Sequence, residues 1–185
     1  MAARAAGAGV DWIQIREKDL GGRALFDLVS AVVAQAAPAR ILVNDRLDVA
    51  LAAGAAGVHL GGEGLPVGPV RGWCGAGAPK GFLVGKSCHS LEEARLAERE
   101  GADYVFFGPV FATPSKLAFG PPQGIERLGE VCRALRIRVV AIGGITPKNA
   151  CECVHAGAGG VAAIRWFQEP GDLDARVAAL RGACG

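Results

Sequence analysis

The chain lacks several features that would assign it to a membrane, a secreted or a nucleic-acid-binding class. No uncharged apolar run approaches the roughly 20 residues that span a bilayer, and neither end carries a secretory pattern. Its formal net charge at pH 7 is only +2, which is too small to indicate a nucleic-acid or membrane partner. These absences favour a cytoplasmic protein that acts on small molecules.

Familiar catalytic and metal-binding spacings are missing as well. The six cysteines form no paired C-x-x-C motif, and Cys151 and Cys153 fall in a predicted helix where their side chains diverge, so free thiols are expected. No Ser/His/Asp spacing or histidine–carboxylate cluster supports hydrolysis by a triad or by zinc. We expect His59 to be a hydrogen-bonded core residue, His89 to support a loop, and His155 to lie on the surface.

A regular alternation of short apolar runs and helix signals is present throughout the 185 residues. With 51% hydrophobic and 21% charged residues, the chain fits one domain, residues 1–185, with a sizeable core. Ser90 followed by Glu93 forms a capping box, and Thr146 is expected to cap a helix whose first residue is Pro147. This alternation predicts βα architecture. The predicted strands are 12–16, 41–45, 57–60, 82–87, 104–108, 139–143 and 160–164.

A weak internal repeat indicates how the strands are counted. Glycine-led segments start at Gly7, Gly54, Gly101 and Gly157, and each is expected to end a helix and lead into a strand. Their spacings of 47, 47 and 56 residues (54 − 7, 101 − 54, 157 − 101) each equal two βα units. We therefore expect a TIM-type (βα)8 barrel of seven strands that lacks the first strand, in a chain shorter than the typical length of about 250 residues. The exposed sheet edge left by that strand would favour a homodimer.

Polar side chains cluster where the predicted strands end, as in parallel-sheet enzymes. Gln14, Arg16 and Lys18 are two residues apart, so they share a face and suit an oxyanion. Asn44 offers an amide for a phosphate oxygen, and Asp45 a carboxylate for Mg²⁺. The alternative interpretation is a solvated strand end and ordinary turn chemistry.

The later strand ends also suit a phosphorylated ligand. Thr113, Ser115 and Lys116 place two hydroxyls and an ammonium in one loop. The turn at Gly143 and Gly144 and the glycine-rich passage ending at Ile164 and Arg165 would let the backbone approach a phosphate, as after strands seven and eight of barrels. A polar surface loop and structural glycines in tight turns would look the same.

Taken together and in this order, these motifs resemble the thiamine phosphate synthase and TenI superfamily of barrels. The resemblance covers essentially the whole chain. The matching segments are Gln14-Ile15-Arg16-Glu17-Lys18, Val43-Asn44-Asp45-Arg46, Gly57-Val58-His59-Leu60-Gly61, Gly85-Lys86-Ser87-Cys88-His89, Gly108-Pro109-Val110-Phe111 with Thr113-Pro114-Ser115-Lys116, and Ala141-Ile142-Gly143-Gly144-Ile145-Thr146.

The resemblance implies an enzyme that joins hydroxymethylpyrimidine pyrophosphate to thiazole phosphate with Mg²⁺, releasing pyrophosphate and thiamine phosphate. It implies catalytic roles for Arg16, Lys18 and Lys116, and a metal ligand in Asp45. The roles implied for the remaining side chains are pyrophosphate binding by Gln14, Arg16, Lys18, Asn44 and Lys116, pyrimidine contact by Ser87, and binding on the thiazole phosphate side by Thr113, Ser115, the Gly144 backbone, Ile164 and Arg165.

Three positions depart from the family patterns. The synthase pattern has Gln-Glu-Asp, with a second metal-binding aspartate, where this chain has Gly62-Glu63-Gly64. Arg165 replaces a small hydroxyl residue, and would either hold a phosphate or fill the pocket. Pro109 stands where TenI-like tautomerases carry a histidine. The alternatives are a TenI-like barrel, as a tautomerase relative or a non-catalytic thiazole or thiamine phosphate binder, and a barrel retained as an interaction subunit.

Overall fold

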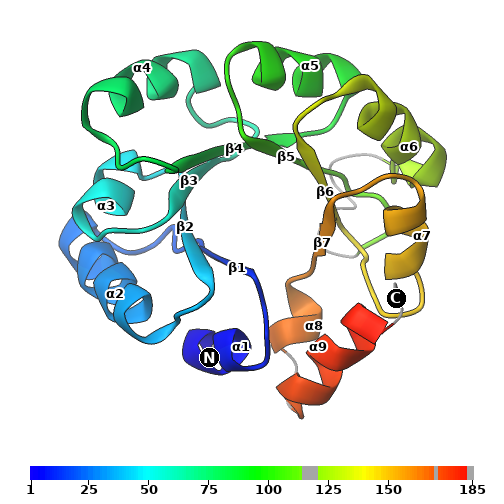
Figure 1. Ribbon diagram of the computed structural model, residues 1–185, viewed down its shortest axis with the longest axis horizontal. Coiled ribbons are helices and arrows are strands. Elements are labelled where there is room, and N and C mark those ends of the chain that lie inside the picture. Colours follow the sequence, from blue (N-terminus) through cyan, green and yellow to red (C-terminus); the bar gives the residue numbers. More distant parts are fainter. Residues whose placement is uncertain (114–120, 169–170, 183–185) are drawn as a thin grey trace.

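Seven parallel strands form one curled sheet in the computed structural model, which describes residues 1–113, 121–168 and 171–182. The strands are hydrogen-bonded in chain order, from β1 to β7, and enclose a barrel interior (Figure 1). Each strand is therefore joined to its neighbour in the sheet by a βα crossover, the arrangement of a TIM-type barrel. The strands are β1 (Trp12–Ile15), β2 (Arg40–Asn44), β3 (Gly57–Leu60), β4 (Leu83–Cys88), β5 (Tyr104–Phe107), β6 (Arg138–Ile142) and β7 (Gly160–Ala162).

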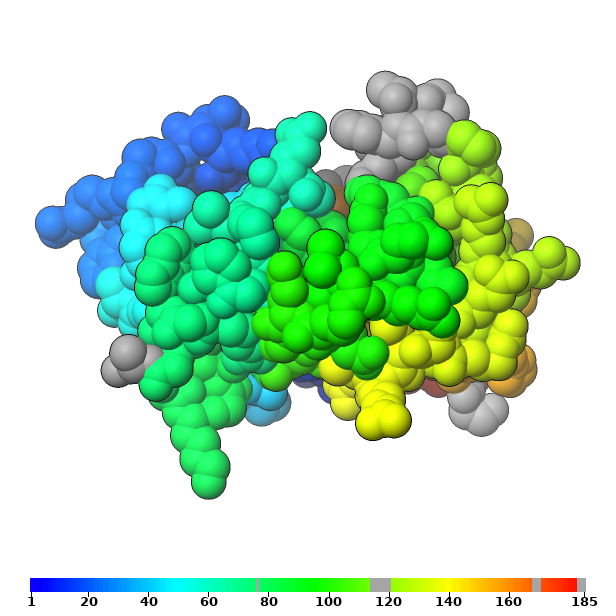
Figure 2. Space-filling view, turned by 90° about the horizontal axis from the view of Figure 1, so that it is seen from above, coloured from blue at the N-terminus to red at the C-terminus, as the bar shows by residue number. Residues whose placement is uncertain are grey.

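Helices surround this sheet on its outer side. Figure 2 shows neighbouring segments of the sequence lying side by side across one side of the molecule, as expected when each helix returns beside the strand that precedes it. The helices are α1 (Ala2–Gly7), α2 (Gly22–Gln35), α3 (Leu47–Ala52), α4 (Val67–Gly77), α5 (Leu91–Arg99), α6 (Gly124–Ala134), α7 (Ala150–His155), α8 (Arg165–Gln168) and α9 (Leu173–Gly182). Of the helices described, none is long and apolar enough to cross a bilayer.

The predicted strands are confirmed, because each of the seven runs overlaps one observed strand with small shifts at the ends. The sheet is also open, as expected for seven strands. In the part of the chain that is described, β1 pairs with β2 alone and β7 with β6 alone. Helices α1, α8 and α9 lie beside the gap between these two edges (Figure 1).

Glycines end the helices before alternate strands, as the repeat predicts. Gly54, Gly101 and Gly157 have positive φ angles of 68°, 94° and 103°, which L side chains rarely adopt. The first copy also ends a helix, since Gly7 is the last residue of α1, and Gly9, two residues later, has the positive φ angle of 94°.

One of the two predicted helix starts is confirmed. Ser90 caps α5, since its Oγ accepts a hydrogen bond from the Glu93 amide at 3.1 Å. Thr146 is not the cap of α7, which begins at Ala150 with Asn149 as its N-cap residue. Thr146 and Pro147 instead open a turn, because Asn149 uses its side chain to hold this turn rather than to cap the helix.

Apolar side chains divide between two layers, as the two faces of a barrel sheet require. The interior layer contains Leu42, Tyr104, Phe106 and Val140, with Trp12 packed against them. The outer layer lies between the strands and the helices and includes most of the buried valines and alanines. The sheet is thus fixed from both sides, and its carboxyl ends carry the polar side chains considered next.

Candidate active site

A chain of hydrogen bonds links the polar residues at the ends of the first three strands. Gln14 Nε2 donates to Asn44 Oδ1 at 2.8 Å, and Asn44 Nδ2 donates to Asp45 Oδ2 at 2.7 Å. The other Asp45 carboxylate oxygen accepts from the Gly61 amide at 2.7 Å. The sequence therefore placed Gln14, Asn44 and Asp45 correctly beside one another. Arg16 and Lys18 follow β1 as exposed side chains at the same end of the barrel.

Asp45 has an unusual backbone conformation. Its φ is 57°, a left-handed value that is uncommon for residues other than glycine, and its amide donates to the His59 carbonyl at 2.9 Å. Such conformations persist where the surroundings hold them and concentrate at functional sites. The carboxylate is consequently held over the end of β3, although the residue itself is exposed.

Lys86 organises the loop that departs from the synthase pattern. Its Nζ donates to the carbonyls of Gly61 and Gly62 at 2.6 and 3.2 Å, and lies 3.5 Å from that of Gly64. A Cβ on Gly64 would collide with Asp45 Oδ1, so the loop lies against the carboxylate. An ammonium group and close backbone packing thus occupy the surroundings in which a second acidic ligand would have to fit.

These residues fit a magnesium ion that takes few protein ligands. Mg²⁺ commonly keeps several waters and binds through one or two carboxylates together with substrate phosphates. Asp45 supplies one exposed carboxylate, and the described residues contain no group of three acidic, histidine or cysteine ligands. The geometry therefore suits a metal shared between Asp45 and a bound phosphate, and not a cage built by the protein alone.

Ser87 belongs to a second polar chain that runs into the barrel. Its Oγ lies 2.9 Å from His59 Nε2, and His59 Nδ1 lies 3.0 Å from the Tyr104 hydroxyl. His59 is 1% exposed, which confirms it as a hydrogen-bonded core residue. Burial, with a smaller effect of the Lys86 charge, lowers the pKa of His59 to about 3, so the ring is neutral at physiological pH.

Loops after β5 and β6 pair with each other on the far side of the mouth. The Val110 and Phe111 amides donate to the Ile142 and Gly143 carbonyls at 2.9 and 3.0 Å. Asn149 Nδ2 donates to the Gly144 carbonyl at 2.9 Å, and Asn149 Oδ1 accepts from the Thr146 amide at 2.8 Å. Asn149 therefore holds the turn that contains Gly144, whose backbone is predicted to bind on the thiazole phosphate side.

The glycines of this turn are required by close packing. Gly143 and Gly144 have φ angles of 96° and 67°, and a Cβ on Gly144 would lie 2.7 Å from Phe111 Cβ. Thr113 is partly buried at the end of the facing loop, whereas the predicted Ser115 and Lys116 lie outside the described residues. The turn is tightly packed, as structural glycines require, and it also lies at the mouth of the barrel, where a phosphate would bind. The structure is therefore compatible with both interpretations of these glycines.

Ile164 and Arg165 follow β7 beside the glycine turn. The register pairs Ile142 with Ala162, so the segments that follow these two residues leave adjacent strands. Arg165 opens α8 as an exposed residue, and Ile164 is 61% exposed. Arg165 is accordingly available to a ligand and does not occupy the barrel interior.

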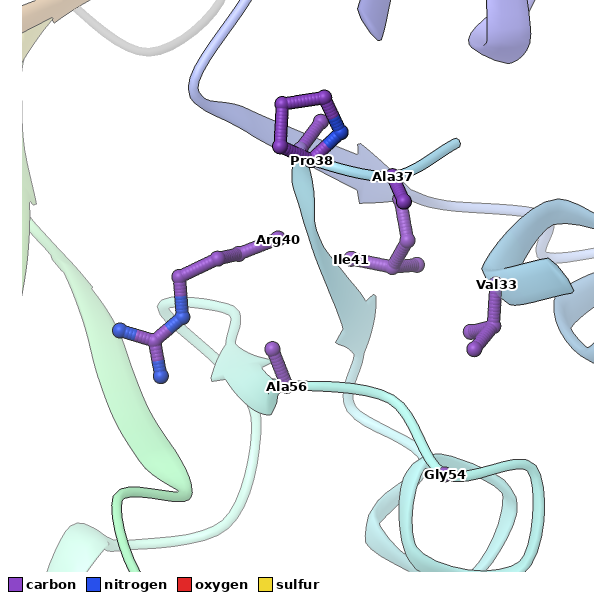
Figure 3. A pocket seen from close by; sticks show the side chains of 8 residues that line it. Val33, Ala37, Pro38, Arg40, Ile41, Gly54 and Ala56 are labelled. Carbon is purple, nitrogen blue, oxygen red and sulfur yellow. The ribbon is translucent and has the colours of Figure 1, made fainter. Parts of the chain in front are cut away.

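One hollow on the described surface lies away from this mouth. Val33, Pro38, Ile41 and Ala56 help to line a hollow of about 180 Å³ near the amino ends of β2 and β3 (Figure 3). Arg40, also in its lining, is committed to the Gly81 carbonyl at 2.7 Å. Barrel enzymes act at the opposite, carboxyl end of the strands, so this hollow is not part of the candidate site.

The remaining histidine and cysteine predictions agree with the structure. His89 Nδ1 lies 2.5 Å from the Gly108 carbonyl and so supports a loop, and His155 is exposed. Cys151 is partly exposed while Cys153 is buried, as expected for diverging side chains, and none of the five cysteines in the described ranges forms a disulfide.

Sequence reasoning missed three residues that shape the site. Lys86 was noted only as a member of the Gly85–His89 motif. A lysine inside an apolar strand, directly before a serine, could have indicated a residue of the site. Tyr104 looked like an ordinary aromatic strand residue, because its partner is 45 positions away. Asn149 gave only a turn signal. All three act by positioning backbone or another side chain.

Comparisons with known proteins agree with this architecture. The sequence profile described as thiamine monophosphate synthase matches residues 1–167. The thiamine-phosphate synthase of Methanoculleus marisnigri is 48% identical over 186 aligned residues, covering 98% of this chain and 85% of that protein. That of Anaeromyxobacter dehalogenans is 44% identical, with 98% and 81% covered. The solved thiamine phosphate pyrophosphorylase of Pyrococcus furiosus superposes with a TM-score of 0.88 at 33% identity, covering 99% and 87%. The chain belongs to the thiamine monophosphate synthase family.

Proposed function

We propose that this protein is a thiamine phosphate synthase, a transferase that condenses hydroxymethylpyrimidine pyrophosphate with thiazole phosphate. The observation that carries the proposal is the bonded set Gln14, Asn44 and Asp45 at the mouth of a barrel of this family. An amide pair next to a carboxylate suits a phosphate chain with its metal ion. The relatives named thiamine-phosphate synthase support the same activity.

The pyrophosphate binds, in this proposal, at the open ends of β1 and β2. Arg16 and Lys18 supply positive charge there, with Lys116 from the loop after β5, while Gln14 and Asn44 orient oxygen atoms. Departure of pyrophosphate leaves a pyrimidine carbocation, so the charge that develops on the leaving group is what the site must stabilise. The thiazole nitrogen is the nucleophile in this reaction, so the protein does not have to supply one.

Asp45 would hold the magnesium ion together with the pyrophosphate. When bound, Mg²⁺ neutralises charge on the leaving group. The protein's own contribution is to keep Asp45 in place, through the Asn44 and Gly61 hydrogen bonds and its left-handed backbone. Because the second aspartate of the synthase pattern is absent, we propose that one protein carboxylate suffices.

The two organic substrates meet between Ser87 and the glycine turn in this scheme. Ser87 contacts the pyrimidine, while Thr113, Ser115 and the Gly144 backbone bind the thiazole phosphate side. Ile164 and Arg165 complete that end, where the exposed Arg165 would hold a phosphate. Exclusion of water from this space protects the carbocation until the thiazole nitrogen attacks it.

An end-point assay tests the proposal directly. Protein is incubated with both substrates and Mg²⁺, and thiamine phosphate and pyrophosphate are measured. We expect product with the native protein, a large loss with Asp45→Asn and Asn44→Ala, and native activity with Asp48→Asn, whose carboxylate pairs with Arg46. Thiazole phosphate binding without any product from folded protein would contradict the synthase and support a TenI-like binding barrel.

We further propose that the protein works in the cytoplasm on these small phosphorylated substrates. The lack of disulfides among the described cysteines is consistent with a reducing compartment.

A further inference from the structure

Three residues on consecutive strands lie in one row across the barrel interior. The register pairs His59 of β3 with Gly85 of β4, and Gly85 with Tyr104 of β5. A Cβ on Gly85 would collide with the Tyr104 ring and hydroxyl, so the tyrosine passes directly over the glycine. Tyr104 thereby reaches His59 although β3 and β5 are not neighbours in the sheet.

The direction of the hydrogen bonds along this row follows from burial. Tyr104 is fully buried, and burial raises the pKa of its hydroxyl, so the group keeps its proton. A buried hydroxyl hydrogen needs an acceptor. Within the described residues, the acceptor in reach of Tyr104 is His59 Nδ1, at 3.0 Å.

The hydrogen bond from Tyr104 fixes the tautomer of His59, and the tautomer determines how His59 bonds to Ser87. A neutral imidazole carries one N–H and one lone pair, so Nδ1 accepting from Tyr104 leaves the proton on Nε2. His59 Nε2 therefore donates to Ser87 Oγ, 2.9 Å away. Ser87 lies two residues beyond Gly85 on the same face of β4, at the carboxyl end of the strand, and remains partly exposed.

We infer that Tyr104 and His59 are positioning residues that make Ser87 a hydrogen-bond donor to the substrate. With one lone pair of Ser87 engaged by His59, its own O–H is directed into the mouth, toward an unprotonated ring nitrogen of the pyrimidine. The opposite tautomer would make Ser87 donate to His59 and present only a lone pair. This inference rests on the proposed function for the identity of the acceptor, but the tautomer itself does not.

The tautomer is measured by two-dimensional ¹H–¹⁵N NMR of the histidine rings in the native protein without substrate. His59→Gln identifies the His59 signals by their loss. We expect a proton on Nε2 and a bare Nδ1. A proton on Nδ1, or on both nitrogens, would overturn the inference whatever the activity of the protein, so this result is separate from failure of the synthase assay.

Steady-state kinetics then test the path from Tyr104 to Ser87. We expect Tyr104→Phe to raise the KM for the pyrimidine pyrophosphate roughly three- to tenfold, the value of one neutral hydrogen bond, and to leave the KM for thiazole phosphate unchanged. In a Ser87→Ala background, Tyr104→Phe should change this KM by less than roughly twofold, because the serine hydroxyl that it acts through is already absent.

Trp12→Phe is the matched packing control. Its ring contacts Tyr104 at 4.8 Å between centroids but has no part in the hydrogen-bonded row. It should leave both KM values near native. An equal Tyr104→Phe effect in both backgrounds, or equal effects on both substrates, would show that Tyr104 acts only through packing and would overturn the inference.

Discussion

His59 is neutral because the barrel interior removes its ring from water. The pKa of a histidine in an unfolded chain is 6.5, and that of His59 in the folded protein is about 3. Below pH 6.5 the unfolded chain therefore binds a proton that the folded protein does not bind. The contribution of His59 to the free energy of unfolding is therefore fully present above pH 6.5 and is lost as the pH falls toward 3.

A comparison of the native protein with His59→Gln tests this linkage. At about 1.4 kcal/mol per pH unit, the native protein should lose roughly 2 to 3 kcal/mol more than the variant between pH 7 and pH 4.5. Urea unfolding at the two pH values measures the difference. Parallel losses in the two proteins would show that His59 takes up its proton without unfolding.

Gly64 shows why the missing aspartate cannot simply be restored. A side chain at this position meets Asp45 Oδ1 and lies 3.1 Å from the Gly61 backbone. We expect Gly64→Ala to displace the carboxylate and to raise the KM for the pyrimidine pyrophosphate by roughly tenfold, the effect of one charged hydrogen bond.

Gly62→Ala is the matched control for this change. Its Cβ would lie 3.6 Å from His89 Nε2, an ordinary contact, so the variant should bind substrate as the native protein does. Equal effects of the two alanines would indicate that the loop as a whole is sensitive, and not the contact with Asp45.

Residues of the candidate site could be predicted from the sequence only where they lie at the carboxyl end of a strand. Gln14, Asn44 and Asp45 each follow an apolar run, and the rule that parallel strands end together brings them into one place. Tyr104 could not be predicted, because its contact with His59 depends on the register of three strands and on the absence of a side chain at Gly85.

Among the elements, strands were easier to locate than helix starts. Runs of valine, isoleucine and leucine are bounded by polar clusters, so each strand has two sequence signals. The start of α7 also had two signals, Thr146 as a cap and Pro147 as the first helical residue, but both residues are equally compatible with a turn. Tertiary demands decided the outcome, since Asn149 is needed to hold Gly144.

The cap of α5 provides a test of local helix stability. Ser90→Ala removes the acceptor for the Glu93 amide and should lower the free energy of unfolding by about 1 kcal/mol. Ser30→Ala is the control, because the Ser30 hydroxyl is buried with no partner among the described residues. Urea unfolding should show no loss for Ser30→Ala, and equal losses would contradict the capping role.

The turn before α7 can be tested through substrate binding. Asn149→Ala removes both hydrogen bonds that hold the Gly144 and Thr146 backbone. We expect the KM for thiazole phosphate to rise roughly tenfold, with a smaller change for the pyrimidine substrate. Cys151→Ala, on the first turn of the same helix, should leave both values near native. A rise confined to the pyrimidine substrate would refute this assignment.

At the scale of the whole molecule, the helical layer is continued beside the gap in the sheet. α1 and α9 pack together, and Arg181 donates to the Gly9 carbonyl at 2.5 Å and to Asp11 Oδ2 at 2.8 Å. Sequence analysis predicted the open sheet but not this contact, because it joins residues about 170 positions apart. The expected homodimer stays a prediction.

Stability measurements separate packing from charge at this contact. Val177 is buried on α9, so Val177→Ala should cost about 1 to 3 kcal/mol. The Arg181–Asp11 ion pair is mostly exposed, so Arg181→Ala should cost less than about 1 kcal/mol. Urea unfolding compares the two variants, and a larger loss for Arg181→Ala would mean that the ion pair dominates the contact.

Gly85 has a consequence for any attempt to change what this barrel accepts. Because Gly85 has no side chain, Tyr104 of β5 can cross β4 and reach His59. Tyr104 thereby decides whether Ser87 donates or accepts a hydrogen bond at the mouth, although it does not contact the ligand. Ligand preference can therefore be retuned from Tyr104, a buried position that a search confined to the mouth would never sample. Conversely, a methyl group at residue 85 would collide with the Tyr104 ring and displace its hydroxyl from His59, so this glycine is as much a part of the ligand preference as Ser87 itself.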